Sequence, residues 1–277
     1  MKAVLTILKK KPIITMIIAF ITGVAGIRLL DSDDIFAAGV LRYILALAMC
    51  VFLYLISGEK TFEKSEKTTG YVIKHLMGII IFAAVILGLS IFGVVYSHNP
   101  LADRWFIEVL KVVFLCLGVG IFEELVFRAI MFDGFMYAFR DKKWVFAVSA
   151  VLDSLIFGYV HVMNEEMSST VVIAQIGLKT LSTGLWGLCL LILYWKTRNI
   201  WGCAIVHAIY DILPQLCNAM FVTAEGVSES GYVNTGVLGG AAVGLYTIQI
   251  IVMVIILLVL WKKVVKTIDF EEIRRDW

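Results

Sequence analysis

The stretch Phe114–Phe132, FLCLGVGIFEELVFRAIMF, decides what kind of protein this is. Its residues are apolar or glycine except for Glu123, Glu124 and Arg128. A charged side chain in the hydrocarbon of a bilayer is costly unless it is paired or meets water, so charges at that depth mark a functional site by default. The stretch therefore predicts a membrane helix that carries a functional site.

The composition of the whole chain indicates the same class of protein. Of the 277 residues, 61% are hydrophobic and 17% are charged, which excludes a soluble domain of ordinary composition. A helix needs about 20 apolar residues to cross a bilayer, and about eight segments qualify. They are residues 13–30, 37–56, 71–96, 106–139, 144–162, 171–195, 200–221 and 237–261. Their runs are too long for barrel strands, so we expect an all-α, polytopic transmembrane helical bundle, with residues 1–277 forming a single membrane domain.

The distribution of Lys and Arg predicts the orientation of this bundle. Basic residues gather before the first expected span and after the second, fourth, sixth and eighth, while the other connections carry mostly acidic residues. By the positive-inside rule both termini are cytoplasmic, and we expect an integral protein of a bacterial cytoplasmic membrane. Topology thus explains the basic residues, and nothing indicates a nucleic-acid partner. The five cysteines are scattered through the spans and indicate neither a disulfide framework nor a cysteine zinc site.

The expected helix gives one of its two glutamates an ion-pair partner and leaves the other without one on the same helix. Residues four apart lie on one helix face, so Glu124 can pair with Arg128. Glu123 points about 100° away around the helix and must meet another span or water. The same three residues also fit a purely structural clasp between helices.

Two further apolar segments carry polar residues at the same spacing. Phe157 and His161 share one face of the expected fifth span, and His207 and Asp211 share one face of the seventh. A single membrane histidine is often only a satisfied hydrogen-bond donor. Three such segments together predict one common polar site.

The three segments resemble the motifs of a known protease family. EELVFR (123–128), FGYVH (157–161) and HAIYD (207–211) resemble the EExxxR, FxxxH and HxxxN/D motifs of the CPBP family. These are the CAAX-protease and bacteriocin-processing intramembrane endopeptidases, also called the Abi family. The resemblance covers about residues 106–221, the expected catalytic core.

The resemblance implies hydrolysis of a peptide bond in a peptide or membrane-protein substrate. By analogy, Glu123 acts as general base on a water that His161 also holds, and His207 with Asp211 stabilises the oxyanion. This agrees with the chemistry of amide hydrolysis, which needs an activated water and donors aimed at the developing charge. Asp211 stands where the family also has Asn, and unlike Asn it donates a hydrogen bond only when protonated.

The resemblance also assigns supporting residues and leaves alternatives open. Arg128 is expected to brace Glu124, and Phe157 to support the site by packing. No cofactor is expected, although Glu123, His161 and His207 are suitable Zn²⁺ ligands for a metal-dependent alternative.

Two functions other than proteolysis also fit the composition. One is a non-catalytic immunity or signalling protein of the same architecture that binds a peptide or partner. The other is a proton-coupled transporter, which is less favoured because the sequence has no inverted repeat.

Overall fold

The computed structural model describes residues 2–30, 32–57, 62, 65, 67–222 and 236–268. Within these residues the regular structure is helical, apart from an isolated bridge between Leu101 and Phe221. The predicted all-α class is therefore confirmed. The termini, for which a cytoplasmic location is predicted, include residues 1 and 269–277, which lie outside the described residues.

Eight apolar helical segments correspond to the eight predicted spans. Seven of them are long and apolar enough to cross a membrane within the described residues. They are α2 (Pro12–Leu30), α3 (Ile35–Ser57), α4 (Thr69–Tyr96), the continuous run of α5 (Trp105–Glu124), η2 (Leu125–Phe132) and α6 (Asp133–Ala138), then α8 (Thr170–Thr197), α9 (Ile200–Met220) and α10 (Gly236–Lys263). The protein is therefore an integral membrane protein.

The eighth segment, α7 (Val145–Val160), is shorter than predicted. It has 16 residues, and at a rise of about 1.5 Å per residue it falls short of a hydrocarbon core of about 30 Å. Two short helices lie outside the eight predicted spans. One is α1 (Lys2–Lys10), in the basic stretch before the first span, and the other is the 3₁₀ turn η3 (Val265–Thr267).

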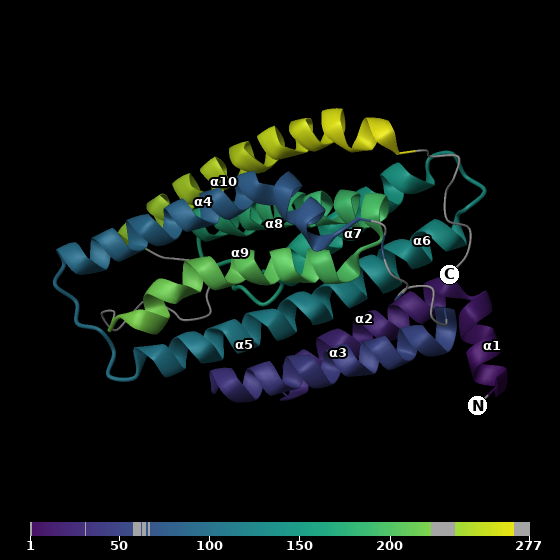
Figure 1. Ribbon diagram of the computed structural model, residues 1–277, viewed down its shortest axis with the longest axis horizontal. Helices are drawn as coiled ribbons and strands as arrows, with labels where there is room; N and C mark the ends of the chain where they lie inside the picture. The colour runs from purple at the N-terminus through teal and green to yellow at the C-terminus, as the bar shows by residue number, and fades with distance from the viewer. Residues whose placement is uncertain are drawn as a thin grey trace. The chain divides into compact units, whose positions relative to one another are not determined.

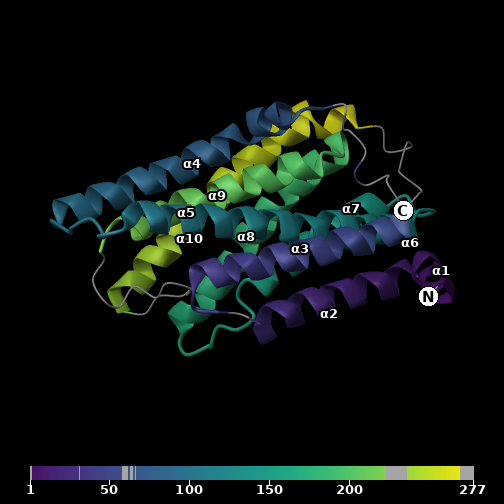
Figure 2. The same ribbon diagram turned by 60° about the horizontal axis from the view of Figure 1, so that its bottom comes forward.

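The chain divides into two compact units. The first holds α1 to α6 with α9, and the second holds α7, α8 and α10. Within the first unit α9 packs between α4 and α5, and α3 packs against the other side of α5 (Figures 1 and 2). Because α5 and α9 are neighbours, the EELVFR and HAIYD motifs lie on adjacent helices.

A glycine permits the close approach of α5 and α9. A Cβ atom at Gly120 would lie 2.5 Å from the carbonyl oxygen of Ala204 and 3.1 Å from the backbone nitrogen of Ala208. Such a contact is possible only for a residue without a side chain, as is usual where membrane helices touch backbone to backbone. Gly120 therefore sets the distance between the two motif-bearing helices.

The helix that carries EELVFR changes its winding immediately after the two glutamates. Residues Leu125–Phe132 form a π-helix, and all eight of them are buried. The wide turns of a π-helix are rare in proteins as a whole. Those that do occur are often found at functional sites. Arg128 lies within this segment, so the motif spans the junction between α-helix and π-helix.

The far end of the π-helix is fixed by an ion pair. Arg198, just before α9, donates from Nη1 to Oδ1 of Asp133 at 2.8 Å and from Nη2 to Oδ2 at 2.5 Å. The planar guanidinium matches the carboxylate in this two-point contact. It ties the beginning of α6 to the beginning of α9.

Candidate active site

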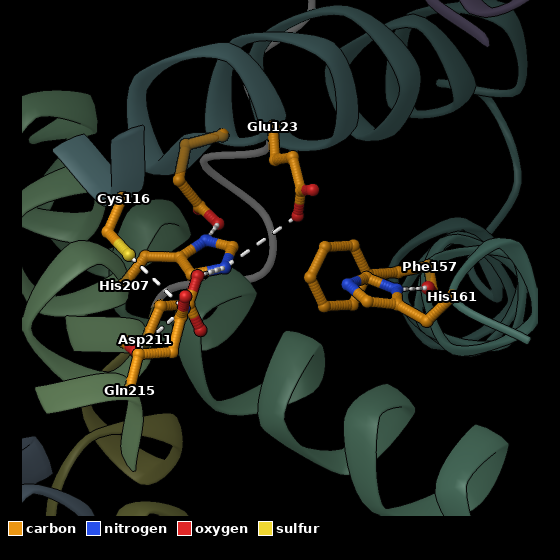
Figure 3. A network of polar contacts seen from close by, with 8 residues as sticks. Cys116, Glu123, Phe157, His161, His207, Asp211 and Gln215 are labelled. Atoms are coloured by element: carbon orange, nitrogen blue, oxygen red, sulfur yellow. Dashed lines mark hydrogen bonds and ion pairs between the residues drawn. The ribbon is translucent and has the colours of Figure 1, made fainter. Parts of the chain in front are cut away.

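One histidine on α9, His207, lies close to three carboxylates, and Figure 3 shows it beside Glu123 and Asp211. His207 Nδ1 lies 2.9 Å from Glu124 Oε1, and Nε2 lies 3.4 Å from Asp211 Oδ2 and 3.7 Å from Glu123 Oε2. The side chain of His207 is only 2% exposed. A single buried imidazole therefore joins the EELVFR and HAIYD motifs.

Glu124 links this histidine to Arg128. Its Oε2 lies 3.1 Å from Arg128 Nε, and both side chains are fully buried. Its other oxygen, Oε1, accepts the hydrogen bond from His207. The pair expected between Glu124 and Arg128 is thus present, and the sequence did not reveal that Glu124 also orients the imidazole ring.

Glu123 and Asp211 occupy the more open side of the ring. Their side chains are 17% and 27% exposed, whereas that of Glu124 is fully buried. The separation of 3.7 Å between Glu123 and His207 is too long for a direct hydrogen bond but short enough for an ion pair. Both carboxylates face Nε2 of His207, whereas Glu124 binds Nδ1 on the buried side of the ring.

A second set of contacts holds the backbone at Asp211. Gln215, one turn further along α9, donates from Nε2 to the carbonyl oxygen of Asp211 at 3.0 Å and to Cys116 Sγ on α5 at 3.3 Å. Pro214 precedes Gln215 inside the helix and has no backbone N–H to donate. The Gln215 side chain therefore adds a link between α5 and α9 where the helix loses a backbone bond.

Phe157 and His161 belong to the second unit. His161 Nδ1 lies 2.7 Å from the carbonyl oxygen of Phe157, and the two rings meet edge to face with centroids 4.9 Å apart. Since a carbonyl only accepts, Nδ1 carries the proton, and the neutral ring then has its lone pair on Nε2. Because α7 ends at Val160, His161 lies in the turn beyond the helix and not within the span as predicted.

The structure adds one charged residue that the sequence analysis overlooked. Arg42 lies on α3, in the apolar sequence of a predicted span, and its Nη1 atom is buried. It interacts electrostatically with Glu123. The rule that singled out Glu123, a charge inside an apolar segment, would also have found Arg42.

The described residues contain no group of three or more His, Cys, Asp or Glu side chains arranged to hold a metal ion. Of the alternative zinc set, Glu123 and His207 lie in the first unit and His161 lies in the second.

Comparison with known proteins yields one match. Residues 103–213 match the family described as type II CAAX prenyl endopeptidase Rce1-like. The matched segment contains all three motifs and confirms the resemblance to the CPBP membrane proteases. No curated protein and no solved structure matches the chain. The family is one of membrane peptidases, which implies a peptide or protein substrate.

Proposed function

We propose, on the premise that residues 103–213 form an Rce1-like protease segment, that this protein hydrolyses a peptide bond within the membrane by means of an activated water. The observation that carries the proposal is the contact of one buried imidazole with three carboxylates inside that segment. Hydrolysis of an amide needs a base for the water and a donor for the carbonyl oxygen. This network supplies candidates for both.

Glu123 is the proposed general base. It removes a proton from water while the water oxygen attacks the carbonyl carbon of the substrate. The same proton is then delivered to the amide nitrogen as the C–N bond breaks, so the carboxylate returns to its starting form. The partial exposure of Glu123 supports this role, since the water must reach it.

His161 is proposed to hold the same water. With Nδ1 donating to the carbonyl of Phe157, Nε2 is the nitrogen that accepts a hydrogen bond. Phe157 then acts by fixing the ring of His161. His161 belongs to the second unit and Glu123 to the first, so the proposal includes that these two side chains meet at the same water.

His207 is proposed to stabilise the oxyanion. Its Nδ1 is held by Glu124, which is in turn held by Arg128, so the ring orientation is fixed before a substrate arrives. When the ring is protonated, Nε2 carries the N–H that faces the reacting oxygen, and Asp211 at 3.4 Å stabilises the positive charge.

The reaction is proposed to need no cofactor, and the substrate to be a peptide or membrane protein in a bacterial cytoplasmic membrane. A zinc ion on Glu123, His161 and His207 would supply Lewis-acid chemistry in the alternative mechanism. The words "prenyl endopeptidase" describe the matched family. Whether this protein requires a prenylated substrate is one of the questions that the experiment below answers.

The test uses purified full-length protein in detergent micelles and a library of quenched apolar peptides, each with and without a prenylated cysteine. Wild type is compared with His161→Ala and His207→Ala, with and without a zinc chelator. We expect cleavage by wild type, a loss of about a hundredfold or more in both variants, and no effect of the chelator. Inhibition by the chelator that zinc reverses would establish the metal alternative. Variants that cleave at the wild-type rate would refute the assigned roles, and a wild type that binds peptides without cleaving any would favour a binding protein.

A further inference from the structure

Arg42 is a charged residue in a setting that normally excludes charge. It lies in α3 within the sequence IFAAGVLRYILALAMC, which has no other ionised side chain. An arginine in a membrane helix either extends its head group toward the interface or turns it inward to a partner. The Nη1 atom of Arg42 is buried, so the side chain turns inward.

The packing of α3 against α5 brings Arg42 to the helix that carries the glutamates. A Cβ atom built on Gly118 of α5 would lie 3.1 Å from Cβ of Arg42 and 3.2 Å from the ring of Tyr43. The Tyr43 ring also packs against Phe114 of α5, with centroids 4.7 Å apart. Arg42 is therefore anchored beside Gly118, which lies five residues before Glu123 on α5, or about 7.5 Å along the helix axis. This distance is within the reach of a long arginine side chain, and it agrees with an attraction between the two charges.

The charge balance of the network favours a further cation there. Glu123, Glu124 and Asp211 supply three carboxylates, and Arg128 is committed to Glu124 at 3.1 Å. His207 carries at most one positive charge, yet both Glu123 and Asp211 face its Nε2. Like charges placed this close oppose each other's ionisation unless a cation compensates. Arg42 brings the number of cationic groups to three.

We propose that Arg42 is a positioning residue of this site, whose guanidinium holds the ionised Glu123 carboxylate in place beside His207. The residue acts through Glu123 and does not contact the substrate. Its catalytic consequence rests on the proposed function, whereas the charge coupling between Arg42 and Glu123 does not.

The coupling is tested by a double-mutant cycle on the full-length protein in detergent, with thermal unfolding as the readout. The variants are Arg42→Gln, Glu123→Gln and the double variant. We expect Arg42→Gln to lower the unfolding midpoint in the wild-type background and to have much less effect when Glu123 is already Gln, because no carboxylate is then left uncompensated. Arg104→Gln, at an exposed position before α5, is the matched control and should be additive with Glu123→Gln. Equal effects of Arg42→Gln in both backgrounds would overturn the proposal.

A second measurement separates positioning from simple packing. With a cleavable peptide, Arg42→Gln should reduce kcat by about tenfold or more with little change in KM, and Arg42→Lys should restore most of the rate because it keeps the charge. A lysine variant as slow as the glutamine variant would contradict a role for the charge. If wild type cleaves nothing, the proposed function fails, but the stability cycle still decides the coupling of Arg42 to Glu123.

Discussion

Substitution of Gly120 by alanine should damage both the stability and the site of this protein. The new methyl group would lie 2.5 Å from the carbonyl oxygen of Ala204, where ordinary contact begins near 3.4 Å. The colliding atom is backbone and has no rotamer to change, so α5 and α9 must separate by roughly 0.9 Å. His207 lies in sequence between the two α9 residues that Gly120 touches, and the separation would stretch its 2.9 Å bond to Glu124.

The expected cost follows from these two effects. Overpacking of a close contact costs about 1–3 kcal/mol, and loss of a buried hydrogen bond to a charged group costs about 1.5–3 kcal/mol. We therefore expect Gly120→Ala to be destabilised by a few kcal/mol and to lose most of its peptide cleavage. Thermal unfolding in detergent measures the first effect, and the quenched-peptide assay measures the second.

The matched control is Gly88→Ala on α4. A Cβ atom at Gly88 would meet nothing within 4 Å, so this variant should keep its unfolding midpoint and its activity. If Gly120→Ala unfolds at the same temperature as Gly88→Ala and cleaves as fast, the close contact of α5 and α9 does not set the site geometry and the reasoning is refuted.

Three further predictions concern the buried ion pair, the packing of α7 and the role of Asp211. Arg128→Ala leaves a fully buried Glu124 without its cation, which should cost about 3–5 kcal/mol in a chemical unfolding experiment; a midpoint equal to that of wild type would contradict the buried pair. Gly158→Ala places a methyl group against a backbone carbonyl of α8 and should lower thermal stability by about 1–3 kcal/mol, while Gly177→Ala, with nothing within 4 Å, should not. Asp211→Asn removes the negative charge beside protonated His207 but leaves an amide that can donate to the reacting oxygen, so it should cleave more slowly than wild type, whereas Asp211→Ala loses both and should fall by about a hundredfold; equal rates for the two would argue against a polar role at this position.

The helices were predictable because the bilayer constrains them. A span must be long, apolar and helical to satisfy its backbone, so hydropathy alone located eight helical segments to within a few residues. The pairing of Glu124 with Arg128 was predictable for a similar reason, since it depends only on spacing within one helix.

Contacts between helices were not predictable in the same way. Nothing in the spacing of HAIYD indicates that His207 faces Glu124, because the sequence does not say which faces of α5 and α9 meet. The π-helix was also missed. It differs from an α-helix in that each backbone hydrogen bond joins residues five apart instead of four apart, and this change has no simple sequence signal. The position of His161 beyond the end of α7 shows that an apolar run can extend past its helix. Arg42 was visible in the sequence, but its partner was not.

The most direct test of the central claim compares two glutamine substitutions on the same helix. Glu123→Gln keeps the size of the side chain but removes the proton acceptor, whereas Glu108→Gln changes a glutamate that pairs with Lys111 near the beginning of α5. In the peptide-cleavage assay we predict that Glu123→Gln loses about 10²–10⁴-fold of the rate while remaining folded, and that Glu108→Gln cleaves like wild type. A Glu123→Gln protein that cleaves at the wild-type rate would contradict the glutamate-activated water.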